Sequence, residues 1–225
     1  MEKSEEIKAY FEQGITKLEI KLNQIQKEQI LEFANEFWRW NKVHNLSAVD
    51  NTRDFVFTHL LDSLAVVRPI TDLIAQGLLS KKAKFADLGT GGGFPGILLS
   101  IMFVEHDFVL VDAVKKKTAF LHHIKGKLKL KNVEVVEGRI ENHSKSHPNS
   151  VDATISRAFA ELSTFVSYSL PLLKDMGLIL AMKSQKINEE IQALSNECHL
   201  LRIEELMVPN LNAYRCLAIL QSNHI

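Results

Sequence analysis

One stretch near the middle of the chain combines an acidic residue with four glycines in an order suited to ligand binding. Asp87 and Leu88 end an apolar run, and residues 89–93 read Gly-Thr-Gly-Gly-Gly. This order predicts a strand and a tight turn, followed by a helix that begins near Phe94. Glycine at positions 89, 91 and 93 permits a positive φ and lets a ligand approach the backbone without meeting a Cβ atom. We therefore expect Gly89, Gly91 and Gly93 to bind a cofactor.

The residues around the glycines indicate which cofactor is favoured. Residues 91–96 also fit the Gly-x-Gly-x-x-Gly pattern of dinucleotide sites, so NAD has to be considered. Pro95 lacks the N–H group that a pyrophosphate would use at a helix start, whereas S-adenosylmethionine has no phosphate. The carboxylate of Asp87 suits the ammonium group of this donor, directly or through water. Asp112, at the end of the next strand, suits the ribose hydroxyls of either cofactor. S-adenosylmethionine is favoured, while NAD and a turn that serves only close packing stay open.

Two basic residues follow later strands of the predicted sheet. Arg157 comes after the fourth strand, where its guanidinium could hydrogen-bond guanine O6 or a phosphate. A structural ion pair at the strand end is the alternative. Lys183 follows the fifth strand, and as a flexible point charge it suits a phosphate better than a base edge. Arg157 and Lys183 are the candidate catalytic residues.

A positively charged segment follows Asp112. Residues 115–131 contain seven lysines, two histidines and no acidic residue. Because the segment begins at the edge of the sheet where ligands of such folds bind, Lys116, Lys117 and Lys125 are predicted to contact nucleic-acid phosphates. A solvated helix face, with its apolar side chains turned inward, explains the spacing equally well.

The rest of the pattern predicts the elements that position these residues. Apolar residues recur at helical spacing from Ser4 to about Leu79, which predicts helices without a strand. Short apolar runs then alternate with helical stretches, the pattern of a parallel sheet wrapped by helices. The expected strands are residues 84–88, 108–111, 133–136, 151–155 and 178–182. They are followed by a helix over 187–197 and a hairpin of 200–208 and 214–220, and residues 142–150 are expected to form an exposed loop.

The expected fold class is therefore α/β. It is a doubly wound, Rossmann-like sheet, mostly parallel with one antiparallel strand supplied by the hairpin. The sheet domain should occupy residues 81–225, and residues 1–80 should form an N-terminal helical extension.

Composition narrows the functional classes further. The chain has 27 basic and 27 acidic residues among 225, so any nucleic-acid site must be local. Cys198, expected in a late helix, and Cys216, expected in a late strand, lie in apolar surroundings without a metal-type spacing. This argues against a disulfide scaffold, a metal site and a nucleophilic cysteine near the donor.

The charged N-terminus and the short apolar run over 94–104 argue against a signal peptide and a membrane span, which predicts a cytoplasmic protein.

Several segments together resemble one family. Residues 87–97 are similar to the cofactor loop of the bacterial 16S ribosomal RNA guanine-N7 methyltransferases, whose older name is glucose-inhibited division protein B. The similarity spans nearly the whole chain, and the Trp-Asn and His-Leu-Leu-Asp-Ser pieces are specific to this family. It extends to residues 40–41, 45–47, 59–63, 112 with 116–117, 138–141, 156–159 and 181–183. Two departures are Ser47, where the family often has threonine, and Ser184, where glycine is usual.

The resemblance implies methyl transfer from S-adenosylmethionine to N7 of a guanine in the 530 loop, of the guanine-527 type. The substrate would be 16S rRNA, the 30S subunit or an assembly intermediate. The resemblance also implies that Gly89 and Phe94 line the methionine end of the donor and that Ile140 and Glu141 flank the adenine. Arg157 would reach into the cleft between cofactor and target.

A methyl transfer to guanine N7 requires few catalytic groups from the protein. Guanine N7 carries a free lone pair and the donor is a strong electrophile, so no general base is expected and catalysis is by positioning. Ser156-Arg157-Ala158-Phe159 also differs from the Asn/Asp-Pro-Pro-Tyr segment of exocyclic-amine methyltransferases, which disfavours adenine N6. An enzyme acting on another RNA or a small molecule stays open, as does a non-catalytic module that binds S-adenosylmethionine and RNA.

Overall fold

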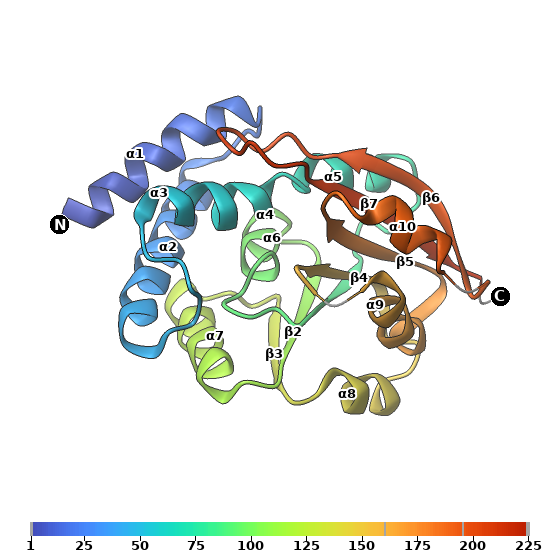
Figure 1. Ribbon diagram of the computed structural model, residues 1–225. Coiled ribbons are helices and arrows are strands. Elements are labelled where there is room, and N and C mark those ends of the chain that lie inside the picture. Colours follow the sequence, from blue (N-terminus) through green and yellow to red (C-terminus); the bar gives the residue numbers. More distant parts are fainter. Residues whose placement is uncertain (1, 160, 195, 224–225) are drawn as a thin grey trace.

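The computed structural model describes residues 2–159, 161–194 and 196–223 and has a seven-stranded sheet at its centre (Figure 1). The strands follow the order β3-β2-β1-β4-β5-β7-β6. Neighbours from β3 to β5 are parallel, and β7 is antiparallel to both β5 and β6. This confirms the predicted α/β sheet with one antiparallel strand. The strands are β1 (Lys84–Leu88), β2 (Asp107–Asp112), β3 (Val133–Glu137), β4 (Val151–Arg157), β5 (Leu173–Lys183), β6 (Cys198–Glu205) and β7 (Cys216–Ser222).

Helices precede the sheet, and among the described residues no strand comes before β1, as the sequence predicts. They are α1 (Glu2–Lys17), α2 (Gln24–His44), α3 (Thr52–Phe55), the π-helical segment η1 (Val56–Leu61), α4 (Asp62–Leu64) and α5 (Val67–Ala75). We call these helices the N-terminal extension. A capping box between Asn23 and Gln26 starts α2, and Asn45 ends it in the left-handed conformation at φ 49°. The division of the chain at residue 80 stays a prediction.

Alternate residues of each strand enter two different apolar cores. Phe85 and Leu110 belong to the core beneath the extension, α6 (Gly96–Met102) and α7 (Lys115–Leu128). Ala86 and Val111 belong to the core on the other face, under α8 (Ile140–Ser146), α9 (Leu162–Ser169) and α10 (Ile187–Gln192). A short 3₁₀ turn, η2 (Leu170–Leu172), leads from α9 into β5.

The extension shares its core with the sheet. Phe37 of α2 packs edge-on against Phe94 and Phe120, with ring centroids 5.0 and 5.8 Å apart. Phe33 packs against the same two rings at 5.1 and 6.1 Å. Such pairs add about 0.5–1.5 kcal/mol each beyond their buried area. This aromatic cluster holds the extension against the glycine turn, since Phe94 follows that turn directly.

Three local predictions are wrong. The expected loop over 142–150 is largely helix α8, because His143 and Ser144 are buried and the Ser144 hydroxyl donates to the Tyr168 carbonyl at 2.9 Å. The expected helix over 187–197 ends at Gln192. Cys198 therefore lies not in a late helix but at the start of β6, whose pairing with β7 outweighs the local helical pattern.

Candidate active site

The glycine turn joins the carboxyl end of β1 to α6. Gly89, Gly91 and Gly93 have φ values of 73°, 61° and 94°, the left-handed region that glycine was expected to supply here. The N–H groups of Gly93 and Phe94 both donate to the Thr90 carbonyl, at 3.0 and 3.1 Å. At Gly89 a Cβ atom would lie 2.9 Å from the Phe159 ring. The turn is thus a tight backbone loop whose first glycine faces an aromatic side chain.

Asp87 lies beneath this turn and is fully buried. Its Oδ2 atom accepts from the Thr90 hydroxyl at 2.7 Å and from the Gly96 N–H group at 2.8 Å. Its Oδ1 atom has no hydrogen-bond partner among the described residues. Burial raises the pKa of Asp87 to about 6, although these two hydrogen bonds act to lower it. Asp87 therefore fastens the turn, and its second oxygen still lacks the donor that a ligand ammonium or a water would supply.

Asp112 stands at the end of β2, opposite the same turn. Its two oxygens accept from the N–H groups of Gly91 at 2.9 Å and Val114 at 2.8 Å, and the Lys117 ammonium lies 3.9 Å away. Each carboxylate oxygen has a second lone pair. Asp112 can therefore hold the turn and still accept from a pair of hydroxyls, as a ribose requires.

Three residues surround the place expected for the adenine. Ile140 lies at the start of α8. Its Cδ1 atom is 4.0 Å from the point where a Cβ atom would stand if residue 89 were not glycine. Glu141 accepts from the Tyr168 hydroxyl at 2.9 Å, and its pKa is lowered by its own backbone N–H group and by that hydroxyl. The structure adds Phe159, whose ring is the nearest neighbour of Gly89. The sequence marked this residue only as part of the Ser156–Phe159 segment.

Two cavities open at this edge of the sheet. A smaller one of about 160 Å³ lies between the glycine turn and the extension, and a larger one of about 300 Å³ lies at the ends of β4, β5 and β7. Arg157 lines both. The smaller cavity is also lined by Phe37, Leu46, Ser47, His59, residues 89–92 and Phe94. The larger includes Thr58, Asp62, Met182, Lys183, Glu190 and Arg215.

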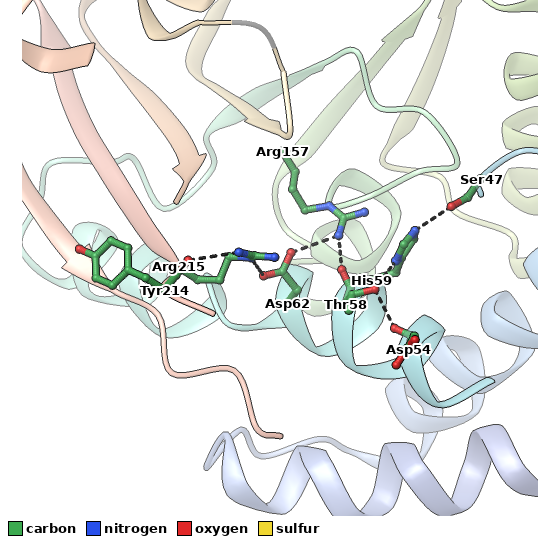
Figure 2. A network of polar contacts seen from close by, with 8 residues as sticks. All are labelled: Ser47, Asp54, Thr58, His59, Asp62, Arg157, Tyr214 and Arg215. Atoms are coloured by element: carbon green, nitrogen blue, oxygen red, sulfur yellow. Dashed lines mark hydrogen bonds and ion pairs between the residues drawn. The ribbon is translucent and has the colours of Figure 1, made fainter. Parts of the chain in front are cut away.

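Arg157 points from the end of β4 toward the extension (Figure 2). Its Nη1 atom donates to the Thr58 carbonyl and, at 3.1 Å, to Asp62 Oδ2, and its guanidinium lies 5.4 Å from the centre of the Phe94 ring. The side chain is 17% exposed. Arg157 therefore forms the structural ion pair that the sequence left open, and it also lines both cavities. Its contact with guanine O6 or a phosphate stays a prediction.

Lys183 closes the far side of the larger cavity. Its ammonium lies 2.7 Å from Glu190 Oε2, which also accepts from the Leu162 N–H group at 2.6 Å. The Lys183 side chain is 11% exposed. This pairing holds the ammonium in one place, so Lys183 enters the cavity as a fixed group rather than as a freely moving charge.

His59 belongs to a chain of hydrogen bonds within the extension. The Thr58 hydroxyl donates to the Asp54 carbonyl at 2.7 Å, so it must accept from His59 Nδ1 at 2.9 Å. His59 Nε2 is then unprotonated and accepts from the Ser47 hydroxyl at 3.0 Å. Burial, with the nearby Arg157 cation, lowers the pKa of His59 to about 3. His59 is therefore a neutral residue with both ring nitrogens engaged.

The lysine-rich helix α7 is less available than its sequence suggests. The Lys116 ammonium donates to the carbonyls of His44 and Asn45 at 2.7 and 2.9 Å, so it ties down the end of α2. Lys117 turns toward Asp112 at the glycine turn. No polar contact of the Lys125 ammonium was found among the described residues, and this lysine remains the best candidate for a phosphate.

Acidic residues of the extension neutralise part of α7. Glu36, whose side chain is 7% exposed, lies 2.6 Å from His123 and 2.8 Å from Lys127. Arg39 also donates to it, at 2.7 Å. Burial raises the pKa of Glu36, but the hydrogen bonds from Lys127 and His123 outweigh this and bring it to about 2. The segment 115–131 contains no acid, so this neutralisation was invisible without the fold.

Arg215 was missed by the sequence-based predictions. It precedes β7, and its Nε atom lies 3.3 Å from Asp62 Oδ1. The His59–Ser63 segment, which the sequence singled out without a role, was the available signal for one half of this pair. Nothing local marked Arg215 itself.

The remaining expectations concern metals and membranes. Within residues 2–159, 161–194 and 196–223, no cluster of three or more histidine, cysteine or acidic side chains suits a metal ion. None of the helices in this part of the chain is both long enough and apolar enough to span a bilayer.

Comparisons with known proteins give one consistent result. The family model described as rRNA small subunit methyltransferase G, GidB, matches residues 26–218. The protein called ribosomal RNA small subunit methyltransferase G from Polynucleobacter asymbioticus is 43% identical over 208 residues, which is 92% of each chain. Its counterpart from Bordetella avium is 38% identical over 92% of this chain and 89% of its own.

Solved structures add the fold. An rRNA methylase from Streptococcus thermophilus has a TM-score of 0.52 at 15% identity, over 69% of this chain and 95% of that one. TYW2 from M. jannaschii, in complex with AdoMet, has a TM-score of 0.53 at 15% identity, over 69% and 76%. These likenesses show the Rossmann-like methyltransferase fold.

Proposed function

This chain belongs to the rRNA small subunit methyltransferase G family, and we propose that it transfers a methyl group from S-adenosylmethionine to N7 of a guanine in 16S rRNA. The nucleotide would be of the guanine-527 type, in the 530 loop. The reaction would take place in the cytoplasm, on 16S rRNA, the 30S subunit or an assembly intermediate.

The observation that carries the proposal is the position of Arg157 in the wall of two adjoining cavities. One cavity is built from the glycine turn, as a donor site requires. The other holds three cationic side chains, Arg157, Lys183 and Arg215, as a site for a nucleotide requires. A methyl group held at the boundary would face the second cavity. The geometry therefore supports a donor and an RNA base meeting beside Arg157.

The residues around the turn suit S-adenosylmethionine. The unpartnered oxygen of Asp87 suits its ammonium group, Asp112 its ribose and Ile140, with Glu141, its adenine. Gly89 and Phe94 would border its methionine end. The donor supplies an electrophilic methyl group; the protein's part is to hold guanine N7 in line with it and to exclude water, a positioning effect worth several kcal/mol.

The groups nearest the site fit a reaction without a general base. His59 has a pKa of about 3 and both its ring nitrogens are engaged, so it accepts a proton poorly at neutral pH. Burial raises the pKa of the Cys216 thiol, which leaves no ready thiolate at the cavity. Guanine N7 attacks with a lone pair and loses no proton, so neither group is needed. In this mechanism Arg157 donates to guanine O6 or to an adjacent phosphate and leaves N7 free.

The decisive experiment uses 30S subunits from cells that lack this enzyme, with methyl-labelled S-adenosylmethionine and nucleoside analysis of the product. Wild type should give labelled 7-methylguanosine. Arg157→Ala should lower the rate by about a hundredfold or more, because a misplaced base loses near-attack geometry. Label on another nucleoside would refute the proposed target, and no label on 30S or on naked 16S rRNA would leave a non-catalytic binding module as the better interpretation.

A further inference from the structure

Asp62 joins the extension to two different strands at one edge of the sheet. Its Oδ2 atom lies 3.1 Å from Arg157 Nη1, at the end of β4, and its Oδ1 atom lies 3.3 Å from Arg215 Nε, just before β7. Figure 2 shows the carboxylate between the two guanidinium groups, with one arginine reaching it from each side. All three residues line the cavity of about 300 Å³. One acidic group from the extension thus brings together two cations that are far apart in sequence.

The burial of the three side chains differs. The Asp62 side chain is only 4% exposed, whereas those of Arg157 and Arg215 are 17% and 30% exposed. The carboxylate is therefore sealed, and the arginines keep part of their surface open. An arginine has five N–H donors in a fixed planar fork. Asp62 accepts a hydrogen bond from one donor of Arg157, whereas its Oδ1 atom faces Arg215 Nε as an ion pair and makes no hydrogen bond among the described residues. The Arg215 fork is further fixed by a 3.1 Å hydrogen bond from Nη1 to the Tyr214 carbonyl.

The charges at the cavity favour an anion. Asp62 balances one of its two arginines, and the Lys183–Glu190 pair balances itself, so this group of side chains carries one net positive charge. Without a carboxylate between them, two guanidinium groups would repel each other and turn apart into solvent. Paired arginines suit a phosphate because its oxygens match the planar forks, and RNA carries one phosphate per nucleotide.

We propose that Asp62 is a positioning residue that sets Arg157 and Arg215 side by side as a clamp for an RNA phosphate next to the target guanine. The proposal rests on the proposed function, since it names how the same site holds its substrate. It gives the His59–Ser63 segment a role in the reaction and makes Arg215 a substrate-binding residue. The π-helical segment η1 includes Thr58, whose carbonyl accepts from Arg157, and π-helical turns often occur at functional sites.

The simplest competing account is that Asp62 only fastens the extension to the sheet. If Asp62 acts through the arginines, Asp62→Asn should matter much less once Arg215 is absent, and losses that multiply would exclude this account. Coupling alone does not establish it, because two residues in contact also couple when they only fasten the extension. The two accounts differ in where the loss appears: the fastening account expects a lower free energy of unfolding with the kcat of the folded enzyme unchanged, whereas the positioning account expects a lower kcat/KM in fully folded protein.

The test measures kcat and KM with undermethylated 30S subunits for Asp62→Asn, Arg215→Ala and the double variant, with donor affinity measured separately by calorimetry. Asp62→Asn should lower kcat/KM by about a hundredfold, as misplaced binding groups do, while donor affinity stays within about threefold of wild type. In the Arg215→Ala background the same change should cost less than about tenfold. Asp72→Asn, a partly exposed carboxylate on α5 of the same extension, is the matched control and should leave activity unchanged.

A second variant keeps the proposal testable if Asp62→Asn does not fold. Arg215→Lys keeps the charge but loses the planar fork, so it should behave like Arg215→Ala rather than like wild type. Full activity of Arg215→Lys would overturn the clamp, as would losses that multiply in the double variant. Failure of the proposed function looks different, because wild type itself would then yield no 7-methylguanosine.

Discussion

The glycine turn and the larger cavity lie on opposite sides of Arg157, yet they are built in different ways. The turn takes its groups from residues 87–96 and from Asp112 on the adjacent strand, and most of its contacts involve backbone N–H groups. The cavity takes Asp62 from the extension, Lys183 from β5 and Arg215 from just before β7. One site is nearly contiguous and made of backbone; the other is assembled by tertiary packing and made of long charged side chains. The glycine turn should tolerate few substitutions in residues 87–96. The larger cavity should depend on how the extension packs against the sheet.

The largest expected effect concerns Asp87, the buried acid of the turn. Its pKa in the folded chain is about 6, above the ordinary 3.8, so folding favours the protonated form. The stability contribution is fully present below pH 3.8 and is lost as pH rises through about 6. A span of about two pH units corresponds to roughly 3 kcal/mol. Urea unfolding from pH 4 to 7 should therefore show wild type losing about this much relative to Asp87→Asn, which does not titrate.

Asp107→Asn provides the control for this measurement. Asp107 is exposed at the other end of β2, so the same change there should leave the pH dependence of wild type intact. The difference in free energy of unfolding between wild type and Asp87→Asn should change from pH 4 to 7. A difference that stays constant would contradict the raised pKa of Asp87 in the folded protein.

These two regions also differ in how far the sequence predicts them. The turn was predicted residue by residue because strand, glycines and acid follow one another along the chain, and Gly89, Gly91 and Gly93 have the positive φ expected of them. The place of Arg157 at the end of β4 was predicted because that strand had been identified, while its role in the reaction stays a prediction. Arg215 was not predicted, because only the insertion of β7 beside β5 brings it to Asp62. The charge of α7 was overestimated for the same reason, since Glu36 reaches it from a different helix.

The next effect tests whether donor binding is confined to the turn. Asp112→Ala removes the acceptor for the N–H groups of Gly91 and Val114 and the oxygens that suit a ribose. Charge-assisted hydrogen bonds contribute about 1.5–3 kcal/mol each, so donor affinity measured by calorimetry should fall about a hundredfold. Binding of 30S subunits should be unchanged within about threefold. Equal losses of donor and 30S binding would show that the two regions are not separable.

A smaller effect concerns the contacts between the extension and α7, and it is measured as a change in the free energy of unfolding. Glu36→Gln removes the charge that Lys127, His123 and Arg39 share, and should lower the free energy of unfolding by about 1–2 kcal/mol at pH 7. The folded pKa of Glu36 is about 2, below the ordinary 4.5, so this stability is present above pH 4.5 and is lost as pH falls toward 2. Urea unfolding at pH 7 and pH 3 should show the gap between wild type and variant narrowing at the lower pH.

Glu32→Gln is the matched control for Glu36. Glu32 also pairs with Lys127, at 2.7 Å, but its side chain is 40% exposed, so its loss should cost a few tenths of a kcal/mol. Glu36→Gln should also slow methyl transfer, because the extension supplies Asp62 to the larger cavity and part of the wall of the smaller one. A variant with methyl transfer equal to wild type would contradict this dependence on the extension.

The smallest effect separates general phosphate contact from the clamp. Lys125→Glu should weaken 30S binding severalfold at low salt and reduce the slope of log K against log salt by about one, the signature of one lost phosphate contact. Lys116→Glu is a poorer test, because Lys116 also holds the end of α2 through the carbonyls of His44 and Asn45. Lys81→Glu, at the opposite edge of the sheet before β1, is the control and should change neither quantity.

Lys125→Glu and Arg215→Ala should differ in their effects on kcat and KM. Both changes remove a contact to phosphate, but Lys125 would hold RNA at the periphery, whereas Arg215 would hold the nucleotide that reacts. Loss of Lys125 should therefore raise KM and leave kcat nearly intact, since binding lost equally from ground state and transition state does not slow the bound complex. Loss of Arg215 should lower kcat as well. If Lys125→Glu lowered kcat as much as Arg215→Ala, α7 would have to contact the reacting base. The cavity at the ends of β4, β5 and β7 could then not be the whole binding site of the target guanine.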